Sequence, residues 1–172
     1  CGKDSVGAIC GLIFNKGTIE DSNNINSFVS GTGNYVGGVC GRNYDGTIAN
    51  CENTGNVSNV GYIGGICGAN LGLVKKCRNS GNITGTGKYV GGVCGSNGGK
   101  LETSYNTGDV KGVDYVGGVC GYQSGGSVDS CYNTGNVTST GDDVGGVCGY
   151  QSGSTSNCYS TGSVTSEKTG AI

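Results

Sequence analysis

The chain has 172 residues, of which 39 are glycine, and it contains no proline, methionine, tryptophan or histidine. The lack of histidine excludes Ser-His and Cys-His catalysis, imidazole metal ligands and a proton switch near neutral pH. Ten basic and twelve acidic residues give a net charge of −2, which argues against a nucleic-acid partner. No apolar run approaches the roughly 18 residues that a membrane span needs.

A string close to V-G-G-V-C-G recurs six times and organises the whole chain. Its copies end at cysteines that are 30, 27, 27, 26 and 28 residues apart. The copies are Val6–Cys10, Val36–Cys40, Ile63–Cys67, Val90–Cys94, Val116–Cys120 and Val144–Cys148. A second string of the form C-x-N-T-G-N-V follows, as in Cys51–Val57. A fixed period of this length indicates a repeat architecture.

Each unit is expected to contain three short β segments, in the following order. The first lies at the V-G-G-V string, the second in the middle of the unit and the third near its end. The corresponding apolar columns begin Val6, Val36, Ile63, then Ile19, Ile48, Val74, then Phe28, Val57, Ile83. These side chains are mostly β-branched, which favours strands. The sequence contains no sustained i, i+3, i+4, i+7 apolar stripe, which is the pattern that would predict a helix.

One unit has too few apolar side chains to enclose a core, whereas stacked copies share one. The sequence therefore predicts an all-β fold, a parallel β-solenoid (β-helix) of about six coils of 26–30 residues with three short strands per coil. Like residues of successive coils would lie about 4.8 Å apart. Residues 1–172 would form one domain. The coils are expected near residues 6–35, 36–62, 63–89, 90–115, 116–143 and 144–172.

A turn position of the repeat is occupied by asparagine in five units. These residues are Asn24, Asn53, Asn79, Asn106 and Asn133. We expect their amides to hydrogen-bond from coil to coil as an internal ladder, with a ligand site as the alternative. Two residues later comes a glycine such as Gly55, which is predicted to supply a positive φ at the coil corner. The paired glycines of V-G-G-V predict close packing or a bulge.

Ten of the eleven cysteines fall into two columns. The first contains Cys10, Cys40, Cys67, Cys94, Cys120 and Cys148. The second contains Cys51, Cys77, Cys131 and Cys158, with Ser22 and Ser104 in its gaps. They are interpreted either as buried free thiols or as disulfides within each coil, such as Cys40–Cys51, which an extracellular location permits. Metal binding is disfavoured because no C-x-x-C spacing occurs.

The chain offers no cluster from which catalytic, cofactor-binding or metal-binding residues can be predicted, and no cofactor is expected. One column of aromatic residues is a candidate ligand face, made of Tyr105, Tyr132 and Tyr159. Tyrosines aligned on one side of a solenoid suit contact with sugars, or they cover a strand.

The two strings together resemble the GLUG repeat of bacterial surface and secreted proteins. The residues that carry the resemblance are V-G-G-V-C-G and, at residues 50–57, N-C-E-N-T-G-N-V. The family core reads roughly G-G-L-V-G and then N-C-Y-x-T-G-N-V. The resemblance covers residues 6–172 and departs where cysteine replaces the family's usual valine. It implies a large multidomain exoprotein with adhesin-like stalks, at the cell surface or outside the cell. It transfers no catalytic residue.

We therefore expect a non-catalytic structural or adhesive segment of an exported bacterial protein, a rigid rod that displays a regular face to a host or cell-surface glycan or protein. The alternative is a carbohydrate-binding or carbohydrate-active β-helix, and catalysis there would need acidic residues gathered on one face. An ice-binding solenoid is less favoured, because the threonine column that begins at Thr54 is imperfect.

The ends of the chain suggest a piece of a longer array. Residues 169–172 resemble the run into another V-G-G-V string. Unpaired strand edges at the ends of a solenoid favour end-to-end self-association. Cys1, followed by Gly2, is interpreted as a cut inside such an array or as the lipid-bearing cysteine of a lipoprotein.

Overall fold

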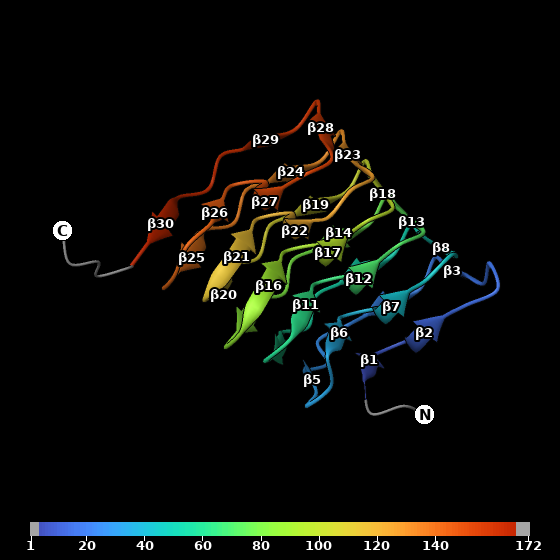
Figure 1. The fold of residues 1–172 in the computed structure, drawn as a ribbon. Helices are drawn as coiled ribbons and strands as arrows, with labels where there is room; N and C mark the ends of the chain where they lie inside the picture. Colours follow the sequence, from blue (N-terminus) through green and yellow to red (C-terminus); the bar gives the residue numbers. More distant parts are fainter. Residues whose placement is uncertain (1–3, 168–172) are drawn as a thin grey trace.

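The computed structural model describes residues 4–167, so the predictions for Cys1 and for residues 169–172 lie outside the described part. The described residues form thirty short strands, wound into six coils of five strands each (Figure 1). Each coil contributes one strand to each of five sheets. Among residues 4–167 there is no helix long and apolar enough to cross a membrane.

The five sheets are numbered by the order of their strands within a coil. Sheet 1 consists of β1 (Ser5–Gly7), β6 (Tyr35–Gly37), β11 (Tyr62–Gly64), β16 (Lys88–Gly91), β21 (Asp114–Gly117) and β26 (Val144–Gly145). Sheet 2 consists of β2 (Cys10–Ile13), β7 (Cys40–Asn43), β12 (Cys67–Asn70), β17 (Cys94–Asn97), β22 (Cys120–Gln123) and β27 (Cys148–Gln151).

The other three sheets complete each coil. Sheet 3 consists of β3 (Thr18–Glu20), β8 (Thr47–Ala49), β13 (Leu73–Lys75), β18 (Lys100–Glu102), β23 (Ser127–Asp129) and β28 (Ser154–Ser156). Sheet 4 consists of β4 (Asn23–Asn24), β9 (Glu52–Asn53), β14 (Arg78–Asn79), β19 (Tyr105–Asn106), β24 (Tyr132–Asn133) and β29 (Tyr159–Ser160). Sheet 5 consists of β5 (Val29–Ser30), β10 (Val57–Asn59), β15 (Ile83–Gly85), β20 (Val110–Gly112), β25 (Val137–Ser139) and β30 (Val164–Ser166).

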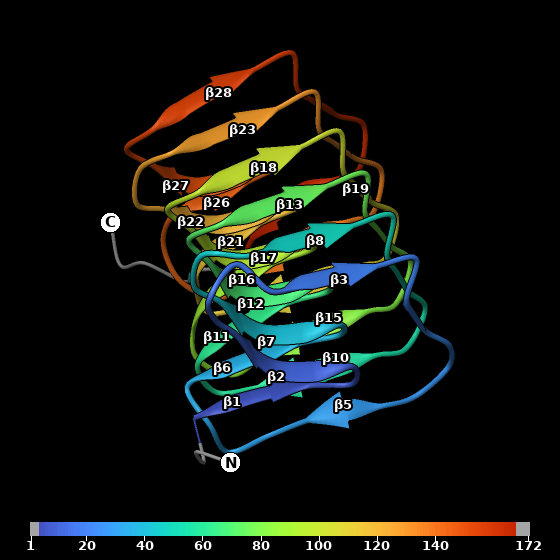
Figure 2. The same cartoon turned by 90° about the vertical axis from the view of Figure 1, so that its right-hand side faces the viewer.

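Neighbouring strands in every sheet are parallel and in register, which confirms the predicted β-solenoid. Val36 pairs with Ile63 in sheet 1, and Ile63 pairs in turn with Val90. Figure 2 shows the strands of sheet 3 as successive rungs, from β3 in blue to β28 in red. Because the repeat has the same length in residues as one coil, like side chains lie directly above each other.

The number of strands per coil is five rather than the predicted three. The V-G-G-V-C-G string contains parts of two strands. In coil 2 the sheet 1 strand β6 ends at Gly37 and the sheet 2 strand β7 begins at Cys40. The chain bends so sharply between them that a Cβ at Gly37 would overlap the Cys40 carbonyl oxygen. The C-x-N-T-G string forms a further two-residue strand, Glu52–Asn53 in coil 2. Bends too tight for a side chain therefore divide segments that look continuous in sequence.

The predicted late apolar column is wrong in coil 1. Val29, not Phe28, pairs with Val57 in sheet 5. The Phe28 side chain is 66% exposed, whereas Val29 is buried. Coil 1 has one more residue between Asn24 and Val29 than coil 2 has between Asn53 and Val57, so the spacing of the later repeats does not apply there.

The predicted left-handed glycine after each asparagine is also wrong. Among the described glycines, positive φ occurs at Gly125 and Gly126 but not in the column of Gly55. The left-handed corner lies instead one residue before the second cysteine column. Its members are Asp21, Asn50, Lys76, Thr103, Ser130 and Asn157. Gly55 is required for a different reason, because a Cβ there would overlap the Ser27 carbonyl oxygen of the preceding coil.

The interior of the solenoid contains two apolar columns. One lies among sheets 2, 3 and 4 and includes Cys40 and Ile48, and the other lies between sheets 1 and 5 and includes Val36. Where the two columns meet, a Cβ at Gly38 would overlap the Asn53 side chain. The second glycine of V-G-G-V thus allows the backbone to approach the asparagine ladder, which confirms that the paired glycines serve close packing.

Candidate functional site

The asparagine ladder predicted from the sequence is present and runs through the interior. Each amide Nδ2 donates to the Oδ1 of the next coil, over 2.6 Å from Asn53 to Asn79 and 2.7 Å from Asn79 to Asn106. The second Nδ2 hydrogen of Asn79 is donated to the carbonyl oxygen of Gly81 in its own coil, at 2.8 Å. The ladder extends from Asn24 to Asn133 and ends on the hydroxyl of Ser160. Each Nδ2 group of the ladder thus has two acceptors, so its members are structural groups.

A second buried amide ladder was not predicted. Asn43 Nδ2 donates to Asn70 Oδ1, and Asn70 Nδ2 donates to Asn97 Oδ1, both at 2.8 Å. Gln123 occupies the next position in the register and donates to the Ser154 carbonyl oxygen at 2.8 Å. The available signal was the polar residue three positions after five of the six cysteines of the first column, at the end of a sheet 2 strand. In coil 1 this position is Ile13.

The ten described cysteines are free thiols, and successive members of the first column pair in register, as Cys67 does with Cys94. Burial raises the pKa of the Cys94 thiol, and it raises that of Cys131 to about 12. The second column makes one recurring hydrogen bond, from the side chain to the carbonyl oxygen two residues earlier. Cys77 makes it at 3.2 Å, and Ser104, which replaces a cysteine, makes it at 2.8 Å. The seven buried thiols behave as small apolar groups with one weak donor each, whereas Cys10, Cys148 and Cys158 are half-buried.

The candidate ligand face at sheet 4 is a stack of parallel rings. The ring centroids of Tyr105 and Tyr132 are 4.6 Å apart and those of Tyr132 and Tyr159 are 5.0 Å apart, with both interplanar angles at 4°. Each ring therefore covers the face of its neighbour, and the solvent meets ring edges. A sugar that stacks on an aromatic residue needs an open ring face, so this geometry favours the structural interpretation of the column.

A longer aromatic surface covers the outward side of sheets 1 and 2, and of its residues the sequence pattern aligns Tyr122 with Tyr150. The stack in sheet 1 has centroid distances of 5.0, 4.4 and 5.1 Å and comprises Tyr35, Tyr62, Tyr89 and Tyr115. Tyr122 of sheet 2 meets Tyr89 edge-on at 5.3 Å, and Tyr150 stacks on Tyr122 at 5.1 Å. We call these six residues the tyrosine surface. It joins the surfaces of the two sheets on one side of the solenoid.

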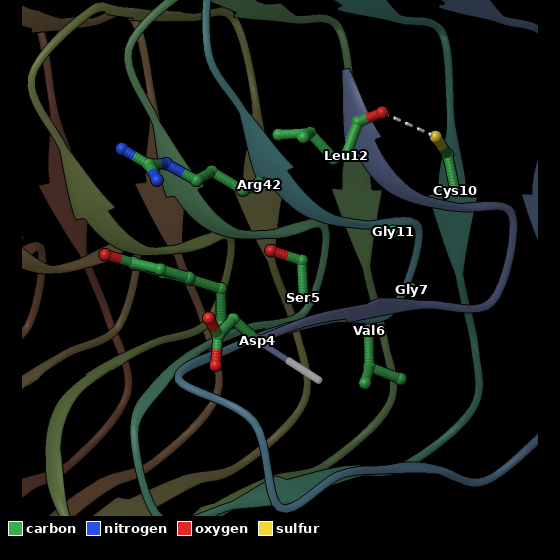
Figure 3. A pocket seen from close by; sticks show the side chains of 9 residues that line it. Asp4, Ser5, Val6, Gly7, Cys10, Gly11, Leu12 and Arg42 are labelled. Atoms are coloured by element: carbon green, nitrogen blue, oxygen red, sulfur yellow. Dashed lines mark hydrogen bonds between the residues drawn. The ribbon is translucent and has the colours of Figure 1, made fainter. Parts of the chain in front are cut away.

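A cavity of about 740 Å³ lies at the coil 1 end of the tyrosine surface (Figure 3). It is lined by Asp4, by residues of β1 and β2, and by Tyr35 and Arg42. The Arg42 guanidinium carbon is 4.9 Å from the ring centroid of Tyr35 and 5.4 Å from that of Tyr44. The Nε of Arg42 is buried and has no hydrogen-bond partner among residues 4–167. The cavity therefore contains a cation held by aromatic rings.

The two ion pairs of the described residues lie elsewhere on the surface. Arg78 pairs with Glu52 at 2.5 Å and Lys88 pairs with Asp114 at 3.3 Å. These exposed pairs contribute little to stability. No group of three or more cysteine, aspartate or glutamate side chains that could hold a metal occurs within residues 4–167.

Comparison with known families finds the GLUG motif at residues 32–58, 112–138 and 140–165. Each match corresponds to one coil, from the turn before its sheet 1 strand to its sheet 5 strand, in coils 2, 5 and 6. The sequence motif and the structural unit are thus the same, as the resemblance predicted. No curated protein and no solved structure matches the chain.

Proposed function

Starting from a chain of GLUG repeats wound into a parallel solenoid, we propose that it is a non-catalytic structural and adhesive segment of an exported bacterial surface protein. The observation that carries this proposal is the continuity of all five sheets through all six coils. Together with the buried amide ladders, this continuity fixes the spacing of every surface residue. Such a column holds its outward side chains in a regular array for a glycan or protein of another surface.

The scaffold part of the proposal is tested by mechanical unfolding, in an atomic force microscope, of several copies of the chain fused in tandem. Because each coil is held to its neighbours by backbone hydrogen bonds along the whole coil, we expect the chain to resist extension until coils detach stepwise. Smooth extension at low force, without steps, would contradict a role in bearing force.

The adhesive part is tested with beads that carry the purified chain, applied to bacterial and epithelial cells. Beads that carry the chain should adhere, and uncoated beads should not. Pretreatment of the cells with glycosidases or with protease separates a glycan partner from a protein partner. Equal retention of coated and uncoated beads would refute adhesion, and release of reducing ends from a polysaccharide would refute the non-catalytic assignment.

End-to-end association of copies is part of the same proposal. Among the described strands, those of coil 1 and coil 6 each pair on one side only, as β1 pairs with β6 and β26 with β21. Unpaired strand edges are templates for further pairing. Sedimentation velocity at rising concentration should show growing rods, and a constant monomer up to high concentration would exclude this association.

A further inference from the structure

The two arginines of the chain differ in their partners. Arg78 pairs with Glu52, whereas Arg42 has no ion pair within residues 4–167. Its guanidinium lies against the rings of Tyr35 and Tyr44, and its Nε is buried without an acceptor. A planar guanidinium fixed in this way is suited to bidentate binding of a carboxylate.

The space beside Arg42 lies where the ring stack of the tyrosine surface ends, at coil 1. In sheet 1, Tyr35 pairs in register with Tyr62 on one side and with Ser5 on the other. The Tyr62 ring stacks on Tyr35 at 5.0 Å, but the small Ser5 side chain leaves the stack without a ring in coil 1. The cavity lies at this position and is lined by Ser5, Tyr35 and Arg42 (Figure 3). A ligand in this space would lie beside the Arg42 guanidinium.

We propose that this cavity binds a uronate residue of an acidic polysaccharide. The carboxylate of the sugar would meet Arg42, its C–H face would pack near Tyr35 and Leu12, and its hydroxyls would hydrogen-bond to Ser5 and Asp4. The volume of about 740 Å³ lies within the range of about 300–1,000 Å³ typical of ligand sites. A phosphate or sulfate fits less well, since it lacks hydroxyls to donate to the Asp4 carboxylate. The site specifies the partner within the proposed function, and it rests on that function.

The test is calorimetric titration of the chain with trigalacturonate and with its methyl ester. The ester keeps the sugar rings and removes the charge, so we expect it to bind at least about tenfold more weakly. Arg42→Gln should weaken trigalacturonate binding by about tenfold or more, and Arg42→Lys should restore only part of it because lysine lacks the planar fork. Arg78→Gln is the matched control, since it removes an arginine that already has a partner, and it should bind like the unmodified chain.

Several outcomes would overturn the site. Equal binding of the acid and the ester would do so without any variant, and so would unchanged binding by Arg42→Gln. Binding of the tripeptide trialanine in place of trigalacturonate would replace the saccharide by a peptide carboxylate. This test is separable from that of the proposed function: beads that adhere to cells although trigalacturonate does not bind refute the uronate site alone, and beads that fail to adhere refute the adhesive role.

Discussion

Removal of the central asparagine of the first ladder, by Asn79→Ala, should destabilise the solenoid more than any surface substitution. Asn79 accepts a hydrogen bond from Asn53 at 2.6 Å and donates to Asn106 at 2.7 Å and to the Gly81 carbonyl oxygen at 2.8 Å. The Asn79 side chain is fully buried. Alanine therefore removes three hydrogen bonds at once, in a place where water cannot replace them.

The expected loss follows from those three contacts. A hydrogen bond contributes roughly 0.5–1.5 kcal/mol net, and a buried group left without a partner costs about 1–3 kcal/mol. The Nδ2 group of Asn53 keeps its bond to Gly55, so part of the penalty is avoided. We expect the free energy of unfolding to fall by about 3–5 kcal/mol. That is a large share of the roughly 5–15 kcal/mol that stabilises a typical domain.

Urea denaturation followed by far-ultraviolet circular dichroism measures this loss. The control is Asn56→Ala, because the Asn56 side chain is exposed and its Oδ1 accepts one bond, from the Asn82 N–H at 3.0 Å. We expect the control to lose less than about 1 kcal/mol. Amide hydrogen exchange shows whether the coils unfold together. If Asn79→Ala and Asn56→Ala have the same denaturation midpoint and slope, the ladder does not stabilise the fold as described.

Three further predictions concern the core. Val93→Asp places a carboxylate in a fully buried apolar column, so it should expose the middle coils to protease and lower the melting temperature; an unchanged melting curve would contradict the interior position. Gly65→Ala adds a Cβ that overlaps Asn79 and the Gly92 carbonyl oxygen, and it should cost about 1–3 kcal/mol in urea denaturation, whereas no loss would show that the backbone can move apart. Iodoacetamide at pH 8 should alkylate partly exposed Cys158 before Cys94, because burial covers Cys94 and raises its pKa, which lowers its thiolate fraction; equal rates in peptide mass spectrometry would refute this.

Most of the architecture was predictable because the repeat itself carries the register. Aligning the six cysteine strings places Val36 beside Ile63 and Asn53 beside Asn79, and the structure pairs the same residues. The bends within a coil were not predictable in the same way. The hydrophobicity pattern of the V-G-G-V string predicts one continuous strand. The bend between sheets 1 and 2 is evident only in the structure, where a Cβ at Gly37 would overlap the Cys40 carbonyl oxygen.

The candidate site was the least predictable part. The sheet 2 position of Arg42 is occupied by Ala69, Ser96 and Tyr122 in later coils. A residue that occurs once in a varied column gives no periodic signal. The approach of Arg42 to the Tyr35 ring depends on the angle at which sheets 1 and 2 meet along the tyrosine surface. The spacing of residues along the chain does not specify that angle.

Both amide ladders have a direction. Every asparagine amide in them donates toward the following coil, as Asn43 does toward Asn70 and Asn79 toward Asn106, and every member after the first accepts from the preceding coil. The bonds to the carbonyl oxygens of Gly46 and Gly81 fix which amide atom is nitrogen. The side-chain dipoles therefore add along the axis, with oxygen facing the first coil and N–H facing the last. A coil inserted within either ladder would have to bring an amide of the same polarity, because a reversed amide would set N–H against N–H.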